Sequence, residues 1–269
     1  TGQNTATFNG HAEPWLAGDS GIYSVIFSPD GKTLASGHED NLIRLWDAAS
    51  GKLLTTFEAD PGDGIYSAAF SPNGKTLASG GRNGTIKLWD VTSGKNTATF
   101  KAVGSGNSVY SLAFSPDGRS LAAGCWLEGG GMLWDVASGK NTAKFKFDRA
   151  DSAALKNPND MVYSVAFSPD GKTLGLGCYN GLIGLWNATS AKKIAVLRGH
   201  TALVRSLAFS PNGRILASGS DDSNVKLWEV GKNAERTGGT RVEAKTQENV
   251  GRASPASPVS PSIVRGKVT

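Results

Sequence analysis

Short runs of alternating apolar and polar residues, each ended by a turn sequence, cover most of the chain. The runs IYSAAF (65–70) and TIKLWDV (85–91) show the alternation expected of β-strands. The stretch that ends the first run, Ser-Pro-Asn-Gly (71–74), joins a proline that fixes φ to a glycine that accepts a positive φ. No stretch keeps a helical period for as long as ten residues. The pattern therefore predicts an all-β protein.

The same pattern returns five times along the chain. The motif Phe-Ser-Pro-Asp/Asn-Gly starts at Phe27, Phe70, Phe114, Phe167 and Phe209, at intervals of 43, 44, 53 and 42 residues. A second motif, Leu-Trp-Asp/Asn/Glu, keeps step with it at Trp46, Trp89, Trp134, Trp186 and Trp228. In the second unit the expected strands are 65–70, 76–80, 85–91 and 96–100. A sheet of four short antiparallel strands cannot bury its faces alone, and radial stacking of such sheets buries them. The repeat thus predicts a β-propeller of four-stranded antiparallel blades, with five repeat units visible.

These motifs resemble WD repeats. The resemblance rests on Gly-His before the first strand, Ser-Pro-Asp-Gly after it, Leu-Ala-Ser-Gly in the second strand and Leu-Trp-Asp in the third. It covers residues 1–230 and implies a propeller that holds protein partners. Propellers of this family close by offset, because the N-terminal segment supplies the outermost strand of the last blade.

The number of blades stays open at this level. The fifth unit has strands at 204–209, 215–218 and 225–230 but no fourth, and Thr5–Phe8 is a spare fourth strand. Five-bladed closure would use that strand. Seven blades are usual in the family, so the chain is alternatively the C-terminal part of a seven-bladed propeller.

Composition and charge narrow the class of partner. The net charge is +5, of which residues 231–269 carry +4 from seven Lys/Arg and three Glu, leaving +1 for the repeats. A nearly neutral body is not typical of a nucleic-acid-binding domain, and no apolar run is long enough for a membrane helix. The segment 231–269 is predicted to be a disordered basic tail containing Ser-Pro steps. Cys125 and Cys178 occupy the same place in two units, which indicates small strand residues rather than a disulfide.

The motifs of enzyme chemistry are incomplete. Gly-Lys-Thr occurs at 31–33, 74–76 and 171–173, but a phosphate loop also needs a glycine five residues before its second glycine, and none stands there. The only histidines are 11, 38 and 200, far apart in the sequence, so no metal site is expected. We expect neither a cofactor nor enzymatic activity.

His200, Ser218, Asp222 and Trp228 match the structural hydrogen-bond tetrad of the WD family, residue by residue. The first unit has Ser36, Asp40 and Trp46, but His11 stands seven residues too early and would have to fold back to join them. His38 is expected in an exposed turn. The other units lack the histidine, so their blades should depend more on packing. They carry Ser79, Asn83 and Trp89 in unit two, Ala123 and Glu128 in unit three, and Leu176 and Asn180 in unit four.

Two repeated positions predict a binding face. In each unit the connection between the second and third strands shares one end of the blade, here called the top face, with the start of the first strand. Four residues before each motif phenylalanine stand Tyr23, Tyr66, Tyr110, Tyr163 and Arg205. Twelve residues after it, in the turn between the second and third strands, stand Glu39, Arg82, Trp126, Tyr179 and Asp221. Tyr, Trp and Arg commonly anchor interfaces, so these ten are candidate partner-binding residues. Alternatively, the tyrosines pack between blades.

The sequence thus favours a non-enzymatic, monomeric, cytoplasmic WD-repeat scaffold that binds a protein or peptide on its top face. The alternative is the C-terminal sensor region of a larger signalling protein, such as a kinase or NTPase. A third hypothesis, a propeller-fold hydrolase or lyase, needs acids or histidines at the channel mouth, where Glu39, Asp221 and Arg205 are the nearest candidates. The insertion 147–160, with a helical turn expected at 151–156, is either a tolerated loop or a partner contact.

Overall fold

The computed structural model describes residues 7–8, 21–60, 62, 64–102, 107–126, 130–148, 151 and 161–230. The expected tail at 231–269, His11, Glu128 and most of the 147–160 insertion lie outside these residues.

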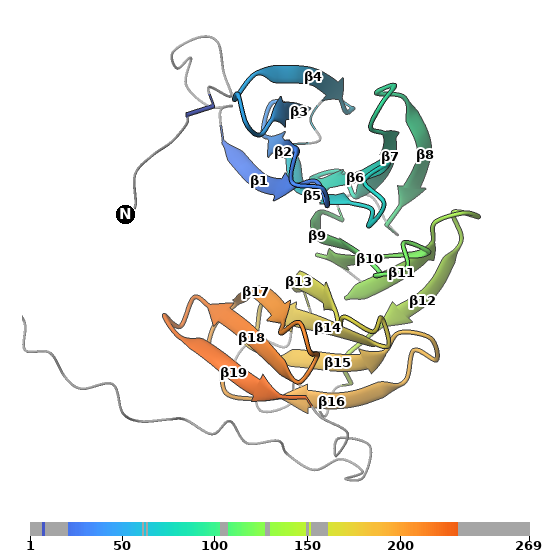
Figure 1. Cartoon of the computed structure of the whole chain (residues 1–269). Coiled ribbons are helices and arrows are strands. Elements are labelled where there is room, and N and C mark those ends of the chain that lie inside the picture. The colour runs from blue at the N-terminus through green and yellow to red at the C-terminus, as the bar shows by residue number, and fades with distance from the viewer. Residues whose placement is uncertain are drawn as a thin grey trace, which may run out of the picture.

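Five antiparallel sheets, one for each repeat unit, make up the described structure (Figure 1). Blade one contains β1 (Ile22–Phe27), β2 (Thr33–His38), β3 (Leu42–Asp47) and β4 (Leu53–Glu58). Blade two contains β5 (Ile65–Phe70), β6 (Thr76–Gly81), β7 (Thr85–Asp90) and β8 (Asn96–Lys101). Blade three contains β9 (Val109–Phe114), β10 (Ser120–Cys125), β11 (Gly131–Asp135) and β12 (Asn141–Phe145). Blade four contains β13 (Val162–Phe167), β14 (Thr173–Cys178), β15 (Ile183–Asn187) and β16 (Lys193–Leu197). Blade five contains β17 (Val204–Phe209), β18 (Ile215–Ser220) and β19 (Val225–Glu229). The all-β prediction is confirmed.

The strands end where the turn chemistry places them. In the first unit the Ser28 hydroxyl donates to Asp30 Oδ1 at 2.6 Å and accepts the Thr33 N–H at 2.9 Å, while Gly31 adopts a φ of 70°. The other four units repeat the serine contacts and the glycine conformation. Gly31, Gly74 and Gly171 of the Gly-Lys-Thr triplets are therefore residues of hairpin turns.

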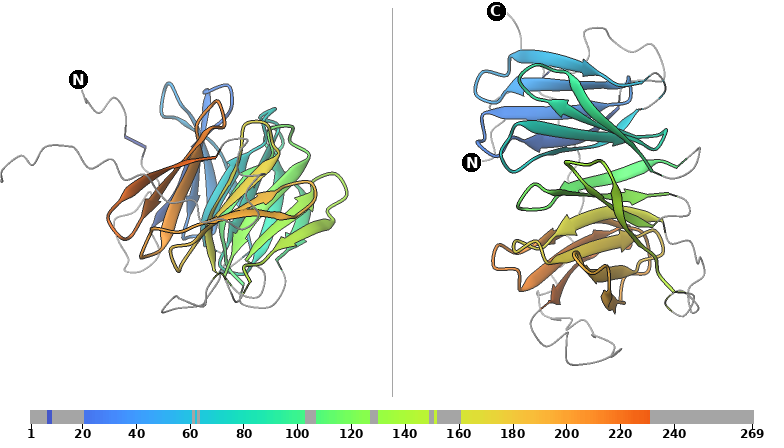
Figure 2. Two further views of the ribbon diagram at one scale, coloured as in Figure 1. Left: turned by 90° about the horizontal axis from the view of Figure 1, so that it is seen from below. Right: turned by 90° about the vertical axis from the view of Figure 1, so that its right-hand side faces the viewer.

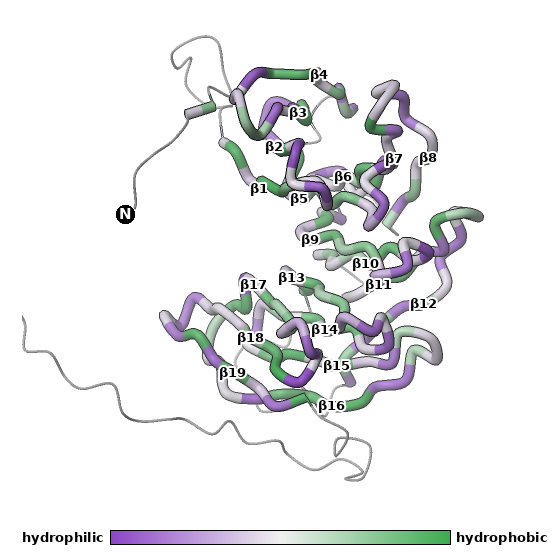
Figure 3. The backbone as a smooth tube through the Cα atoms, viewed as in Figure 1, coloured by the Kyte–Doolittle hydropathy of each residue, from purple (hydrophilic) through white to green (hydrophobic). Residues whose placement is uncertain are grey.

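The hydrophobic core lies between blades rather than within one. The third-strand tryptophans of blades two, three and four each meet a phenylalanine from the outer strand of the preceding blade. The ring centroids are 5.5 Å apart for Phe57 and Trp89, 6.3 Å for Phe100 and Trp134, and 5.8 Å for Phe145 and Trp186. The two views in Figure 2 show the sheets packed face to face in this succession. Hydrophobic and hydrophilic residues alternate along the strands (Figure 3), and the second and third strands of blades two, three and four are largely buried.

In the described residues, the structure does not show the five-bladed closure that was one of the two alternatives. The five sheets form an arc in which β1 and β17–β19 border one opening (Figure 1). The fifth sheet has three strands, and Phe8 lies instead against Trp46 of blade one, with 5.8 Å between ring centroids. Phe8, at the described end of the predicted spare strand, thus contacts blade one.

Candidate functional site

The turn between the second and third strands is held against the start of the first strand in four of the blades. Backbone N–H groups of Glu39, Trp126, Tyr179 and Asp221 donate to carbonyls just before β1, β9, β13 and β17, at 2.9–3.1 Å. These bonds place each turn side chain beside the strand residue predicted to share the top face. The sequence pattern had given the two positions separately, and the structure brings them together.

Each blade pairs its strand residue with its turn residue. Arg205 donates to both carboxylate oxygens of Asp221, from Nε at 2.7 Å and Nη2 at 2.8 Å. Arg82 Nε donates to the Tyr66 hydroxyl at 3.1 Å. In blades three and four the contacts are aromatic, with centroid separations of 5.9 Å for Tyr110–Trp126 and 6.1 Å for Tyr163–Tyr179. In blade one a hydrogen bond with Glu39 raises the pKa of Tyr23.

The four tyrosines also contact one another from blade to blade. Tyr23 meets Tyr66 edge-on at 5.2 Å, Tyr66 stacks on Tyr110 at 5.6 Å and 2°, and Tyr110 stacks on Tyr163 at 4.2 Å and 17°. We call Tyr23, Tyr66, Tyr110 and Tyr163 the tyrosine ladder. Since its residues stand on the innermost strands β1, β5, β9 and β13, it crosses four blades along the inner side of the arc (Figure 1).

The tyrosine rings of the ladder pack against one another but stay partly exposed to solvent. Tyr66, Tyr110 and Tyr163 are half-buried, whereas Tyr23, Trp126 and Tyr179 are 49%, 41% and 39% exposed. Burial, followed by the hydrogen bond with Tyr163, raises the pKa of Tyr110 well above its usual range. The tyrosines contact each other across blades, as the packing interpretation expects, while keeping the partial exposure that the binding interpretation needs.

The charged groups beside the ladder are paired. Arg82 Nη2 lies 3.6 Å from Glu39 Oε1 of the preceding blade, and Arg44 Nη2 lies 2.8 Å from Asp40 Oδ2. Arg205 and Asp221 form a third ion pair, at 2.7 Å.

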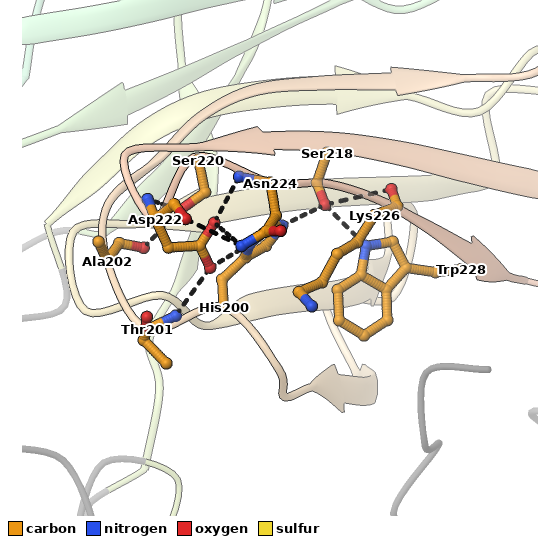
Figure 4. Close-up of polar contacts among 9 residues, drawn as sticks. All are labelled: His200, Thr201, Ala202, Ser218, Ser220, Asp222, Asn224, Lys226 and Trp228. Carbon is orange, nitrogen blue, oxygen red and sulfur yellow. Dashed lines mark hydrogen bonds and ion pairs between the residues drawn. The ribbon is translucent and has the colours of Figure 1, made fainter. Parts of the chain in front are cut away.

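The four tetrad residues of blade five lie in one hydrogen-bonded chain (Figure 4). His200 Nδ1 is 2.7 Å from Asp222 Oδ2, His200 Nε2 is 2.8 Å from Ser218 Oγ, and the Trp228 indole N–H donates to the same hydroxyl at 2.8 Å. Burial opposes ionisation of Asp222, but hydrogen bonds from His200 and from the Thr201 and Asn224 N–H groups hold its pKa far below the usual range.

This chain of hydrogen bonds does not have the geometry of a catalytic triad. Ser218 is buried, and its oxygen already accepts the indole N–H of Trp228. A nucleophilic serine has to be open to substrate. The network instead ties the loop before β17 to β18 and β19.

In blade one the serine is bonded by His38, whose place in the repeat differs from that of His200 in blade five. His38 was expected in an exposed turn, but this prediction is wrong: His38 ends β2, is fully buried, and has Nε2 2.7 Å from Ser36 Oγ. Trp46 donates to the same hydroxyl at 2.8 Å, as Trp89 does to Ser79 in blade two. Asp40, grouped with Ser36 and Trp46 from the sequence, forms an ion pair with Arg44.

A signal in the sequence could have located His38 correctly. It follows Leu-Ala-Ser-Gly at the position where Cys125 and Cys178 stand in their units, and those two were taken as strand residues. Both cysteines are free and buried, and burial raises the pKa of the Cys125 thiol to about 12.

The described part of the chain offers less support for a metal site or for a second binding site. No group of three or more His, Cys, Asp or Glu is placed there to hold a metal ion. A hollow of about 600 Å³ lies at the opposite end of blades three and four, between the Ser-Pro-Asp-Gly turns that contain Asp117 and Asp170. Both aspartates already bond their own turns. No helix in this part of the chain is long and apolar enough to cross a membrane.

Comparisons with known proteins identify the family. Five segments match the family model "WD domain, G-beta repeat", at residues 2–47, 51–90, 94–135, 152–187 and 191–229. The chain therefore belongs to the WD-repeat family.

The similar proteins share limited stretches with it. The chain is 50% identical over 42 residues to the general transcriptional corepressor TUP1 of Saccharomyces cerevisiae, and the match covers 16% of this chain and 6% of that protein. It is 37% identical over 57 residues to eukaryotic translation initiation factor 3 subunit I of Phaeosphaeria nodorum, covering 21% and 15%. Among solved structures, the β-propeller domain of Myceliophteria thermophila Cps50 (Swd1) superposes with a TM-score of 0.68 at 20% identity, covering 78% of this chain and 66% of that one. This structural likeness concerns the fold.

Proposed function

We propose that the protein is a non-enzymatic WD-repeat scaffold that binds a peptide or protein segment on its top face. The observation that carries the proposal is the tyrosine ladder, flanked by Trp126 and Tyr179, on a scaffold whose other repeated positions are almost invariant between units. WD-repeat propellers generally hold partners, and the network of Ser218, His200 and Asp222 is buried rather than open to substrate.

The chemistry of this face suits a segment with apolar or aromatic side chains. Tyrosine and tryptophan bury a large area at little conformational cost and keep a polar group for a backbone hydrogen bond. Because the stacked rings already restrain each other, a partner immobilises few new rotamers when it binds. The paired charges of Arg82 and Arg205 surround this centre and fix the register of the partner.

Panning a random peptide library against the protein tests the proposal. Selected peptides should lose at least about tenfold in affinity when Tyr110→Ser or Trp126→Ser is introduced, since interface aromatics commonly contribute more than about 1 kcal/mol. Lys172→Ser, in an exposed turn at the opposite end of blade four, is the matched control and should leave the affinity unchanged. Peptides that tolerate both aromatic changes but are lost with Lys172→Ser would refute the proposed site.

A further inference from the structure

Each residue of the tyrosine ladder is the extra residue of a β-bulge. In every blade the pairing between the first and second strands skips one position of the first strand, and the skipped residues are Tyr23, Tyr66, Tyr110, Tyr163 and Arg205. A bulge re-aims the side chain of its extra residue and leaves that residue outside the regular backbone pairing. The repeated bulge therefore accounts for tyrosine rings that lie against the rings of neighbouring blades.

The ladder combines apolar rings with hydrogen-bond donors. Trp126 and Tyr179 flank Tyr110 and Tyr163, at centroid separations of 5.9 and 6.1 Å, and both flanking rings are exposed. An indole N–H and a phenol hydroxyl can each donate a hydrogen bond. A ligand that lies along this row needs apolar groups at a regular spacing and backbone carbonyls that are free to accept.

The segment that follows blade five has a proline at every third position. Residues 252–261 read RASPASPVSP, so Arg252, Pro255, Pro258 and Pro261 are spaced by three. A polyproline II helix has three residues per turn and no internal hydrogen bonds. In that conformation the three prolines and Arg252 line one face, and the backbone carbonyls are free. Because proline has no N–H, the segment is poorly suited to pairing with a sheet edge.

The spacing of the prolines matches the spacing of the rings. One turn of a polyproline II helix is about 9 Å long. Two steps of the ladder, from Tyr66 to Tyr110 and from Tyr110 to Tyr163, measure 5.6 and 4.2 Å between ring centroids. Successive prolines on one face of the helix therefore meet every second ring. Aromatic surfaces are a recurring site for the recognition of such proline-rich segments.

An acidic group stands at the blade-five end of the ladder. The strand β17, which carries Arg205, packs against β13, which carries Tyr163. The side chain of Asp221 is 42% exposed, and each of its oxygens accepts one bond from Arg205. Since a carboxylate has about four acceptor positions, Asp221 can also receive the guanidinium of Arg252. Arg252 precedes the prolines, so this pairing directs the segment from blade five toward blade one.

The intervening chain is long enough to bring the segment to the top face. The strand β19 begins after the turn of Asp221 and ends at Glu229, at the opposite end of the blade. The way back along the blade is roughly 20 Å, from the rise per residue of a strand. Residues 231–251 separate β19 from Arg252, and a flexible chain of about twenty residues has an end-to-end distance of roughly 25 Å. A linker whose length matches its span gives the attached segment a high effective concentration, on the order of millimolar.

We propose that residues 252–261 dock on the tyrosine ladder of the same chain as a polyproline II segment. The inference rests on the proposed function, because it gives the partner-binding surface an internal ligand. A partner binds only when the segment is displaced, so the tail lowers the apparent affinity of the top face for other peptides.

Fluorine NMR of the full chain tests the docking. The chain has five tyrosines, and all of them belong to this surface: Tyr23, Tyr66, Tyr110, Tyr163 and Tyr179. Fluorotyrosine therefore reports on this surface alone. A nitroxide is attached through Ser257→Cys, which stands between two prolines and off their face of the helix. Cys125 and Cys178 are buried and stay unlabelled.

The nitroxide should broaden the resonances of Tyr110 and Tyr163, compared with the same sample after reduction of the nitroxide. Alanine at all three prolines should abolish the broadening. One alanine inserted after Ser257 should abolish it too, because the insertion keeps the composition and breaks the spacing of three. The proposal is overturned if the parent shows no broadening, or if the broadening survives either change.

Two controls fix the source of the effect. Three alanines outside the segment should leave the broadening unchanged, at Thr237, Thr240 and Thr246. A mixture of fluorinated chains without nitroxide and nitroxide-labelled chains without fluorine should show no broadening. Broadening in the mixture would mean that a second copy supplies the tail, which also overturns the proposal.

Peptides selected from the random library separate this inference from the proposed function. They should bind the variant without the three prolines at least about threefold more tightly than the parent, because the tail no longer competes. Equal affinities for the two proteins overturn the inference and leave the proposed function standing. A library without binders for either protein counts against the proposed function, and the nitroxide experiment then decides by itself whether the tail docks.

Discussion

At the scale of single residues, one serine hydroxyl organises each polar network at a blade edge. Ser218 joins His200 to Trp228 in blade five, and Ser36 joins His38 to Trp46 in blade one. The two histidines approach from different places, one from the loop before β17 and the other from the end of β2. The equivalent serines of blades one and five therefore each bond a tryptophan and a histidine, although the two histidines stand at different positions of the repeat.

Both histidines should contribute to stability. His200→Ala removes a partner from Ser218 and Asp222, and His38→Ala removes one from Ser36, so each should lower the free energy of unfolding by roughly 1–3 kcal/mol. Lys95→Ala, in a surface turn, is the control and should change it by no more than about 0.5 kcal/mol. Urea titrations measure all three, and a neutral His38→Ala would contradict the burial of that imidazole.

The carboxylate of Asp222 should make stability depend on acid pH. Its pKa is lowered in the folded state, so its stabilising contribution is complete above the ordinary aspartate value of about 4 and is lost as pH falls toward the folded value. Asp222→Asn removes this contribution. The urea midpoint of the parent should therefore fall more steeply than that of Asp222→Asn between pH 5 and about pH 3. Turn aspartates such as Asp47 and Asp90 titrate in both proteins, so their contributions cancel in the comparison. Parallel plots of urea midpoint against pH for the two proteins would exclude the role of Asp222.

At the scale of elements, the unit of the candidate site is an inner strand with its neighbouring turn. Backbone bonds hold the turns of Trp126 and Tyr179 beside β9 and β13. The same geometry places tyrosines of successive blades face to face. Side chains more than 40 residues apart in sequence therefore become one surface.

The ladder should show energetic coupling only between adjacent rings. A double-mutant cycle on Tyr110→Ser and Tyr163→Ser, whose rings stack at 4.2 Å, should give a coupling of about 0.5–1.5 kcal/mol. The cycle on Tyr23→Ser and Tyr163→Ser, which are not adjacent in the ladder, should be additive within about 0.5 kcal/mol. Denaturation midpoints provide both values. Coupling of equal size in the two cycles would mean that the rings act through the blades and not by direct stacking.

At the scale of the whole molecule, the exposure of a side chain at a given repeat position depends on the blade in which it stands. Val225 and Leu227 of blade five correspond to Ile86 and Leu88 of blade two, yet the first pair is largely exposed and the second is buried. The difference comes from the neighbouring sheet, since the two strands are nearly identical in sequence.

Matched threonine substitutions measure this difference. Leu227→Thr should change the free energy of unfolding by no more than about 0.5 kcal/mol. Leu88→Thr should cost roughly 2–5 kcal/mol, because it opens a cavity and buries a hydroxyl in the joint between blades two and three. Comparable losses in urea titrations would mean that the outer face of blade five is covered in solution.

The strands, the turns and their fivefold repetition could be predicted from local sequence. These follow from alternation and from Ser-Pro-Asp-Gly chemistry within a few residues, as the matching bounds of β5 and β17 show. The spacing of Ser218, Asp222 and Trp228 was equally local, since the three stand on adjoining strands and their turn. The two repeated positions of the top face could also be recognised in the sequence. The contacts between them could not.

Which residues are buried could not be predicted from local sequence, because burial depends on how the sheets pack. The burial of His38, the stacking of the tyrosine ladder and the exposure of Ile22 and Val225 all depend on a sheet about 40 or more residues away, or on one that is absent at the ends of the arc. Local sequence sets the conformation of a strand because its turns and alternation lie within the strand itself. Burial is set by the neighbouring blade, so identical repeats acquire different environments according to their place in the arc.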